Sequence, residues 1–342
     1  VDVFPIDERL RYLVPFRPPE EFAAYLVSWK AAGRTMAVLA DDGEKFGGWP
    51  GTDAWVWGSG WLDRFLEILA RLQADGDVEL ATPSQILEDT PSTGPVYLPS
   101  GSYREMEEWS SPRVASGSRG GHWRNFLTRY SESNRMHKKA QALSRLCRER
   151  GDPPEARHAV GRAQCNDVYW HGVFGGLYLR HLREAVWANL AEAEAALRSG
   201  EDLEAESLDL DHDGQMEVWV HGSRFSALIA PARGGCIEEW TLFSAGRNYA
   251  DVLTRRREAY HLPGVSGTGE GETDRPDGGM PSIHDREHSL TFDRLPPVDR
   301  DPRAILVDRV LSGEVSRSAF TEGHYTTLRS WAQRTMDWEA VD

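Results

Sequence analysis

Residues 35–40, TMAVLA, form a short apolar run that ends abruptly at two adjacent acids, Asp41 and Asp42. A third acid, Glu44, follows closely, and a cluster of glycines surrounds Trp49. Such a run predicts a buried parallel strand, and α/β folds place their chemistry at the carboxyl ends of these strands. We therefore expect the two acids to lie at the functional edge of an α/β sheet.

Apolar periodicity over the first hundred residues alternates between that of strands and that of helices. Helical spacing predicts helices over 20–32 and 61–73 and a short helix in SQILEDT, while 77–82 and 94–98 are further strand candidates. Alternation of this kind predicts βα units around a parallel sheet.

The pattern changes twice further along the chain. From about residue 122 to 198 the apolar spacing is helical. After residue 207, short β-rich runs such as MEVWVHG, RFSALIAP and CIEEWTLF are separated by glycine-containing turns, which predicts a sandwich-like domain. Residues 262–286, rich in Gly, Asp, Glu and Pro, predict a long loop.

Composition restricts the classes of partner. A chain of 342 residues, 40% hydrophobic and 27% charged, can form two domains with substantial cores, and no apolar run reaches membrane-spanning length. The net charge of −15 argues against a nucleic acid as the main partner. Three cysteines are too few for a disulfide framework and fit a reducing compartment, so we expect a cytoplasmic protein. Thirteen tryptophans offer flat faces of the kind that sugar rings stack on.

Four long segments, in order, carry a resemblance to a known family. DDGEKFGGWPGT, YLPSGSYREMEEWSSP, RGGHWRNFLTRYSESNRMHKKA and AQCNDVYWHGVFGGLYLRHLREAVW resemble the glycoside hydrolase family 57 enzymes, in particular the branch of 4-α-glucanotransferases and α-amylases. APARGGCIEEW and NYADVLTRRREAYH are similar to the domain that follows the catalytic region in that branch. The resemblance covers nearly the whole chain.

The resemblance implies a retaining α-1,4-glucan enzyme built on an incomplete, (β/α)7 relative of the TIM barrel. Residues 1–115 would be the C-terminal part of that barrel, 116–200 a helical region that completes the catalytic domain, and 207–342 a β-sandwich domain. The implied partners are α-1,4-glucans, with no nucleic acid, no membrane and no cofactor needed for the chemistry; a homodimer is left open. Such an enzyme needs a nucleophile and an acid/base, two carboxyl groups about 5 to 5.5 Å apart.

The resemblance implies that Asp42 is the acid/base. Reasoning from the residues agrees, because a carboxyl group at the end of a buried strand, close to other acids, has its pKa raised by desolvation and like charge. For Asp41, a structural role as a turn cap or as the partner of Lys45 explains the residue at least as well as a role in substrate binding.

The same reasoning yields candidate substrate-binding residues. Besides Asp41, Glu44 can hydrogen-bond sugar hydroxyls or pair with Lys45, and Trp49 is placed to stack on glucose. The segment AQCNDVYWH combines hydrogen-bonding groups with an aromatic platform, as a hydroxyl-rich ligand requires. Its candidates are Asn166, Asp167, Trp170 and His171, although His171 fits a buried, hydrogen-bonded histidine equally well.

The segment DLDHDGQMEVW indicates a candidate calcium loop. Asp209, Asp211 and Asp213, followed by Gly214, have the alternate spacing in which carboxylates converge on Ca²⁺. The twelfth position is Val220 where an EF-hand needs glutamate, which excludes an EF-hand. A calcium loop and a solvated acidic turn both remain open.

The chain also departs from the family pattern. The family nucleophile is a glutamate in a Trp-rich segment before the DDGEKFG motif, and neither that segment nor the family's first motif occurs here. The chain begins at Val1, and we expect a fragment with half a catalytic pair and a truncated sandwich, which does not cleave maltoheptaose by itself. The alternative is a glucan-binding protein without catalysis.

Overall fold

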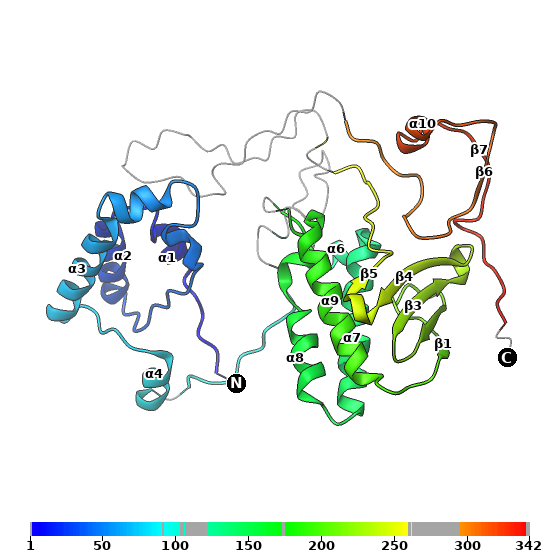
Figure 1. The fold of residues 1–342 in the computed structure, drawn as a ribbon. Helices are drawn as coiled ribbons and strands as arrows, with labels where there is room; N and C mark the ends of the chain where they lie inside the picture. The colour runs from blue at the N-terminus through cyan, green and yellow to red at the C-terminus, as the bar shows by residue number, and fades with distance from the viewer. Residues whose placement is uncertain are drawn as a thin grey trace. The chain divides into compact units, whose positions relative to one another are not determined.

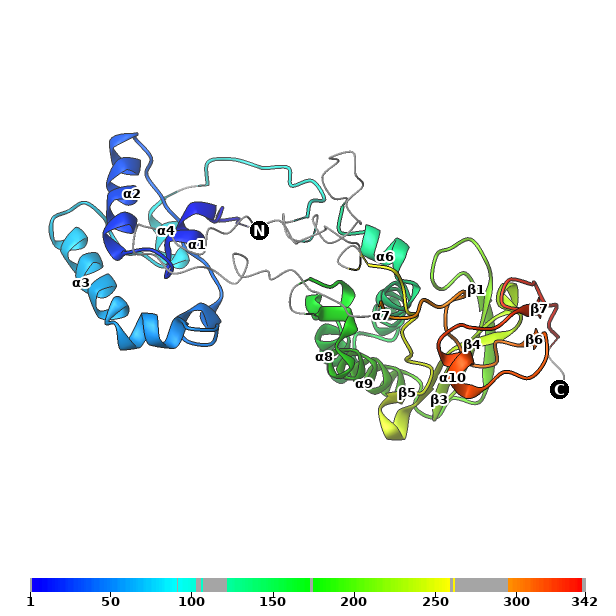
Figure 2. The same ribbon diagram turned by 90° about the horizontal axis from the view of Figure 1, so that it is seen from above.

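The computed structural model describes residues 2–90, 92–102, 106, 122–172, 175–258, 261 and 295–339. These residues fall into two compact units, one formed by residues up to 99 and the other by residues from 100 onward. Figures 1 and 2 show the elements of each unit in two views. Every described helix is too short or too polar to span a lipid bilayer.

The first unit is helical. Its elements are α1 (Glu8–Leu13), α2 (Pro19–Ala31), the 3₁₀ turn η1 (Gly43–Phe46), the π-helical turn η2 (Ala54–Gly58), α3 (Trp61–Ala74) and α4 (Pro83–Asp89). The helices predicted over 20–32, over 61–73 and in SQILEDT are thereby confirmed. The start of α4 has a capping box, in which Thr82 and Gln85 exchange hydrogen bonds, as its sequence favours.

An aromatic core holds this unit together. Trp61 and Phe65 of α3 stack at 4.9 Å between ring centroids, and Phe22 of α2 meets Phe65 edge-on at 5.0 Å. Leu10 and Val56, both buried, complete the contact between α1, η2 and α3. This packing brings the turn after residue 40 close to α1.

The three strands predicted in the first unit are not formed among the described residues. Segments 35–40, 77–82 and 94–98 are extended or irregular and mostly exposed, and no described segment pairs with them as a strand. One backbone bond, from the amide of Asp7 to the carbonyl of Val38, ties the first segment to the chain. An extended segment needs neighbouring strands to satisfy its backbone groups, and local propensity cannot supply them.

The second unit opens with helices, as the spacing over 122–198 predicts. They are α6 (Asn125–Arg129), α7 (Ser131–Glu149), α8 (Pro154–Arg162), the 3₁₀ turns η3 (Asn166–Tyr169) and η4 (Gly176–Tyr178), and α9 (Arg180–Leu197). A five-stranded antiparallel sheet follows, in the order β1-β2-β3-β4-β5. Its strands are β1 (Glu204–Leu208), β2 (Glu217–His221), β3 (Phe225–Ala230), β4 (Cys236–Leu242) and β5 (Arg247–Asn248).

The three β-rich runs that follow residue 207 in the sequence therefore form β2, β3 and β4. The short turns η5 (Pro231–Arg233) and η6 (Phe243–Ala245) lie between strands. Later in the chain, β6 (Arg309–Leu311) and β7 (Thr327–Ser330) form a two-stranded sheet, with α10 (Arg317–Thr321) between them. A full sandwich stays a prediction.

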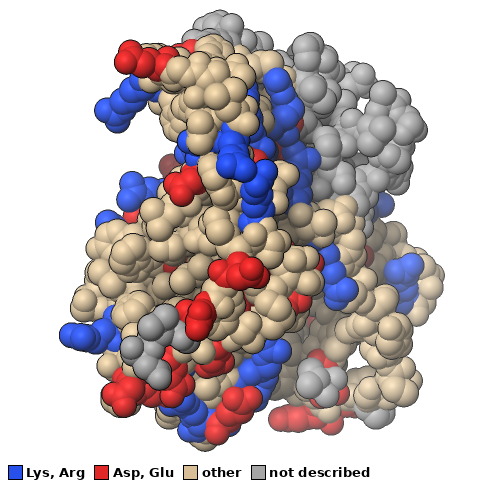
Figure 3. Space-filling model, turned by 90° about the vertical axis from the view of Figure 1, so that its right-hand side faces the viewer, with Lys and Arg blue, Asp and Glu red and all other residues tan. Residues whose placement is uncertain are grey.

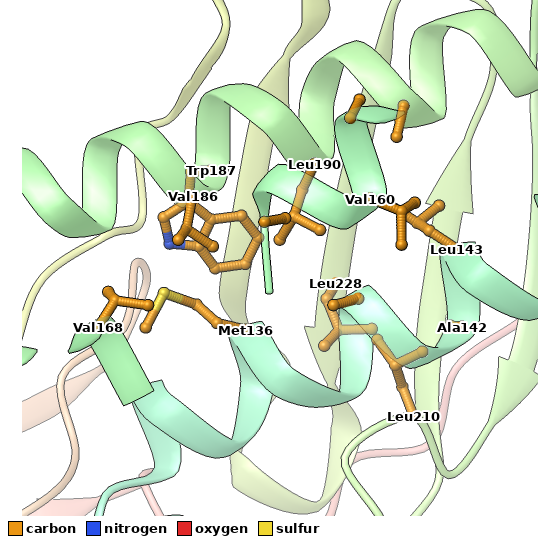
Figure 4. Close-up of a cluster of buried hydrophobic side chains, with 14 of the residues drawn as sticks. Met136, Ala142, Leu143, Val160, Val168, Val186, Trp187, Leu190, Leu210 and Leu228 are labelled. Carbon is orange, nitrogen blue, oxygen red and sulfur yellow. The ribbon is translucent and has the colours of Figure 1, made fainter. Parts of the chain in front are cut away.

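One hydrophobic core joins helices and sheet in this unit. Met136 and Leu143 of α7 and Trp187 and Leu190 of α9 pack in the same cluster as Leu228 of β3 (Figure 4). The helices therefore cover one face of the sheet. On the surface shown in Figure 3, acidic and basic side chains lie among one another.

A buried ion cluster lies between these helices and the sheet. The Nζ of Lys139 in α7 lies 2.8 Å from Oε2 of Glu194 in α9 and 3.0 Å from Oε1 of Glu239 in β4, and each side chain is 1% exposed. The same Nζ donates to Ser226 at 2.8 Å and lies 4.4 Å from the ring centroid of Trp219. Burial raises the pKa of Glu239 despite the nearby lysine.

Removing the lysine should destabilise the second unit strongly. In Lys139→Met, Glu239 loses its ammonium partner while buried, and breaking a buried pair costs about 3–5 kcal/mol of unfolding free energy. Lys139→Met combined with Glu239→Gln should recover part of that loss, because the unpaired charge is removed. Urea unfolding of the two variants measures the difference; equal stability of the single and double variants would contradict this role of charge.

Candidate active site and ligand-binding surfaces

The adjacent residues Asp41 and Asp42 lie in different environments. The carboxylate of Asp41 is 5% exposed, lies 2.5 Å from Nζ of Lys45, and accepts from Nε of Arg11 at 3.1 Å. The side chain of Asp42 is 51% exposed, and its Oδ2 lies 3.6 Å from the guanidinium of Arg11. One carboxylate is thus fixed in the fold, and its neighbour is accessible.

Asp41 also organises the turn that follows it. Its Oδ1 accepts the backbone amide of Asp42 at 2.9 Å, and Lys45 makes a second bond to the carbonyl oxygen of Arg11 at 3.0 Å. Burial, the largest cause, lowers the pKa of Lys45, although Asp41 opposes the shift. The geometry thus shows both structural roles of Asp41, as the partner of Lys45 and as an acceptor for a backbone amide of the turn.

The predicted environment of Asp42 differs from the one found. The expectation was a carboxyl group desolvated beside other acids, whereas in the described residues Asp42 is half-exposed beside an arginine. The reason is that 35–40 do not form part of a buried sheet here, so the end of that segment is open to solvent.

Glu44 and Trp49 lie on the same turn. Glu44 is exposed, and its carbonyl oxygen accepts the amides of Gly48 and Trp49 at 2.7 and 3.0 Å. Gly47 has φ +137°, a conformation that L side chains rarely adopt, which explains one glycine of the cluster. The Trp49 ring is half-buried and stacks on Phe16 at 5.8 Å between centroids. The Nζ of Lys45 also lies 5.5 Å from the centroid of the Trp49 ring.

The segment 166–171 in the second unit divides into exposed and buried residues. Asn166 and Asp167 are exposed, whereas Trp170 and His171 are 8% and 3% exposed. The segment is fixed by Gly176, whose φ is +43° and at which a Cβ would lie 2.2 Å from the carbonyl oxygen of Trp170. Side chains larger than glycine are therefore excluded there.

A pocket of about 660 Å³ places two of these four residues together. Asn166 and Trp170 line it, while Asp167 and His171 are not among its described lining residues. Trp123 and Tyr169, which the sequence did not single out as functional, are part of the same wall. Both belong to the motifs that carry the family resemblance, and this was the signal available for them.

His171 belongs to a buried polar cluster. Its Nε2 lies 2.7 Å from the hydroxyl of Tyr130, and that hydroxyl lies 2.8 Å from Oε2 of Glu258. Tyr178 also donates to Glu258, and Arg129 pairs with it at 3.0 Å. Burial is the main cause that lowers the pKa of His171 to about 4; Glu258 opposes the shift and Arg129 adds to it. The imidazole is therefore neutral at pH 7, and its 3.9 Å approach to Glu258 is not an ion pair.

The predicted calcium loop converges on a different third ligand. Oxygen atoms of Asp209, Asp211 and Glu217 all lie within 4.8 Å of one another, while Asp213 instead accepts the amide of Gln215 at 2.7 Å. Burial, followed by the charges of Asp211 and Asp213, raises the pKa of Glu217 to about 7. Three hard oxygen donors around one point, two of them buried, fit a Ca²⁺ ion. Glu217 continues the alternate spacing of the loop, but it was missed because it lies in the β-rich run that forms β2.

The buried histidine should make stability depend on pH. Unfolded histidine takes up a proton near pH 6.5, about 2.5 pH units above folded His171, so the unfolded state binds more protons between these values. Stability is thus fully present above pH 6.5 and falls by on the order of 3 kcal/mol as the pH falls to about 4. In His171→Gln this part of the slope should disappear, whereas His158→Gln, at an exposed position in α8, should retain it. Urea unfolding across that range is the measurement; equal slopes in both variants would show that His171 is not the group.

Comparisons with known proteins match three successive segments of the chain to related enzyme domains. Residues 1–99 match the profile of glycosyl hydrolase family 57. Residues 121–197 match the middle domain of α-amylase/4-α-glucanotransferase, and 209–340 match its C-terminal domain. A 4-α-glucanotransferase of Thermococcus kodakarensis is 40% identical over 353 residues, covering 96% of this chain and 52% of the relative. An α-amylase of Pyrococcus abyssi is 39% identical over 363 residues, covering 99% of this chain and 53% of the relative.

A solved structure is similar as well. The crystal structure of 4-α-glucanotransferase from Thermococcus litoralis matches with a TM-score of 0.78 and 37% identity, over 99% of this chain and 52% of that one. The chain therefore spans about half the length of the relatives it matches. Successive profile matches across its length, with relatives near 40% identity, show that the chain belongs to glycosyl hydrolase family 57.

Proposed function

We propose that the protein is a retaining α-1,4-glucan-active enzyme, a 4-α-glucanotransferase or an α-amylase, and that Asp42 is its acid/base catalyst. The names of the relatives support the substrate class. The observation that supports the residue is the contrast between a paired, buried Asp41 and an accessible Asp42 one position later. A proton donor must reach the glycosidic oxygen, and an aspartate held by Lys45 and Arg11 cannot.

In this proposal the chemistry follows the two-step retaining scheme. Asp42 protonates the leaving-group oxygen while a second carboxylate, which we assign to no residue of this chain, attacks the anomeric carbon. Asp42 then takes a proton from water or from an acceptor sugar as the glycosyl-enzyme bond breaks. Extended segments such as 35–40 would pair as strands of a (β/α)7 barrel in the complete protein, which would bury the surroundings of Asp42.

The remaining predicted residues would bind the glucan. Trp49, which is half-buried and stacks on Phe16, and the exposed Glu44 both lie on the turn that follows Asp42. Asn166 and Trp170 would contribute through the pocket of the second unit, and Asp167 is exposed next to Asn166 in the chain. We propose a positioning role for His171, whose hydrogen bond to Tyr130 holds the adjacent Trp170.

We propose, separately, that Asp209, Asp211 and Glu217 bind Ca²⁺ as a structural ion. The convergence of their oxygens supports this. Bound calcium would join the loop before β2 to the sheet and take no part in the glucan chemistry.

The first test compares the two aspartates in the complete protein. Asp42→Asn should lower turnover of maltoheptaose by about 10²- to 10⁴-fold, the usual contribution of acid–base assistance, and leave the melting temperature unchanged. A substrate with a good leaving group should lose much less, and azide should partly restore its turnover. Asp41→Asn should lower the melting temperature, because Lys45 stays buried without its counter-ion. Near-normal activity of Asp42→Asn would reject the assignment; binding without any turnover by the unmodified protein would favour the non-catalytic alternative.

A calcium titration tests the second proposal. Saturating Ca²⁺ should raise the melting temperature, because ligands that bind the folded state stabilise it. Glu217→Gln and Asp209→Asn should abolish the rise, and Asp213→Asn, which keeps all three converging carboxylates, should retain it. If the melting temperature does not rise at millimolar Ca²⁺, the loop is an acidic turn that binds no calcium.

A further inference from the structure

The pocket of the second unit differs in charge from the chain around it. It lies between one face of α7 and the segment that includes η3, and its volume of about 660 Å³ is in the usual range for small-molecule sites. Arg145 and Arg148 of α7 line it, and none of its described lining residues is an acid. In a protein of net charge −15, this is a local reversal of sign.

Arg145 and Arg148 are exposed, and neither forms an ion pair with a carboxylate of the described residues. Arg148 makes one long contact, 3.4 Å, with the hydroxyl of Ser144, and after Arg157 it adds to the lowering of the pKa of Asp152. By contrast, Arg150, directly after α7, pairs with Glu201. The pocket also lowers the pKa of His137, chiefly by burial, with Lys138 adding to the shift.

The pocket has an aromatic wall that is held in place. The rings of Trp123 and His137 meet edge-on at 6.3 Å between centroids, and His137 meets Tyr169 edge-on at 5.9 Å. The hydroxyl of Tyr169 donates to the carbonyl oxygen of Ala163 at 2.5 Å, and the amide of Trp123 donates to Ser102 at 2.7 Å. Half-buried, pre-oriented rings of this kind bind the apolar faces of sugars.

From this combination we propose that the pocket binds a glucosyl unit that carries a phosphate group. The ring would lie against Trp123 and Tyr169, and the amides of Gln164 and Asn166 can both donate to and accept from its hydroxyls. The phosphate would lie between Arg145 and Arg148, three positions apart on α7 and therefore side by side. Arginine only donates hydrogen bonds, so two unpaired guanidiniums favour a ligand with anionic oxygens over a neutral glucan.

The inference rests on the proposed function for the identity of the ring as glucose, but it concerns binding alone. A phosphorylated sugar bound here would be an effector or a phosphate-bearing segment of a glucan. Binding can be measured on the 342-residue chain without catalytic turnover, so a failed activity assay does not decide it.

Isothermal titration calorimetry at fixed ionic strength, with glucose 1-phosphate, glucose 6-phosphate, maltose and inorganic phosphate as separate ligands, tests the proposal. At least one sugar phosphate should bind about tenfold or more tighter than maltose and than phosphate alone, because the sugar phosphate meets both the rings and the arginines. Arg145→Gln combined with Arg148→Gln should remove this advantage and leave maltose binding unchanged. Arg180→Gln, at an exposed position on α9, controls for the change in net charge. Trp123→Ala should weaken the binding of both maltose and the sugar phosphates.

Three outcomes would overturn the proposal. One is maltose binding as tightly as either sugar phosphate, which would show that the pocket binds neutral glucans and has no preference for a phosphate group. Another is inorganic phosphate binding as tightly as the sugar phosphates, which would show an adventitious ion only. The third is unchanged sugar-phosphate affinity in the doubly substituted variant, which would place the anion elsewhere.

Discussion

Buried charge must be paired, and both units of this chain are arranged around that constraint. In the second unit Lys139 joins α7, α9 and β4 through two fully buried carboxylates. In the first, Lys45 joins the turn after residue 40 to α1 through Asp41 and the carbonyl of Arg11. Neither lysine can move without leaving a charge in the interior, which costs several kcal/mol. The positions of the helices, the sheet and the turn after residue 40 therefore depend on a few ionic contacts as well as on apolar burial.

This constraint explains how two adjacent residues of the same type can differ in role. A carboxylate that neutralises a buried lysine is committed to the fold, and it also accepts the amide of the next residue, which directs that residue outward. Asp42 is then left accessible, and its backbone amide is tied to the carboxylate of Asp41. In the second unit a similar division holds within 166–171, where His171 is fixed inside while Asn166 reaches the pocket. Buried partners thus orient accessible groups, which is a general way of preparing a site for a ligand.

The sequence predicted those features whose causes are local. Helical spacing located α2, α3 and the helices of the second unit, and alternation located β2, β3 and β4. It failed for 35–40, 77–82 and 94–98, because a strand exists only with partners, which sequence periodicity does not identify. Asp41 and Asp42 were found, but their different environments depend on Arg11, thirty residues away from Asp41 along the chain. Glu258 and the lining residue Trp123 were missed for the same reason, because each acquires its role through contacts distant in sequence. Glu217 is different, because its contacts with Asp209 and Asp211 are local.

The central claim is that Asp41 is locked in the fold and Asp42 is free to react. Carbodiimide coupling of an amine to exposed carboxylates, followed over time by peptide mass spectrometry of the 342-residue chain, tests it most directly. We expect Asp42 to be modified early and Asp41 to stay protected while the chain is folded, because its oxygens are held by Lys45 and Arg11. Modification of both at the same rate, or of Asp41 first, would contradict the account.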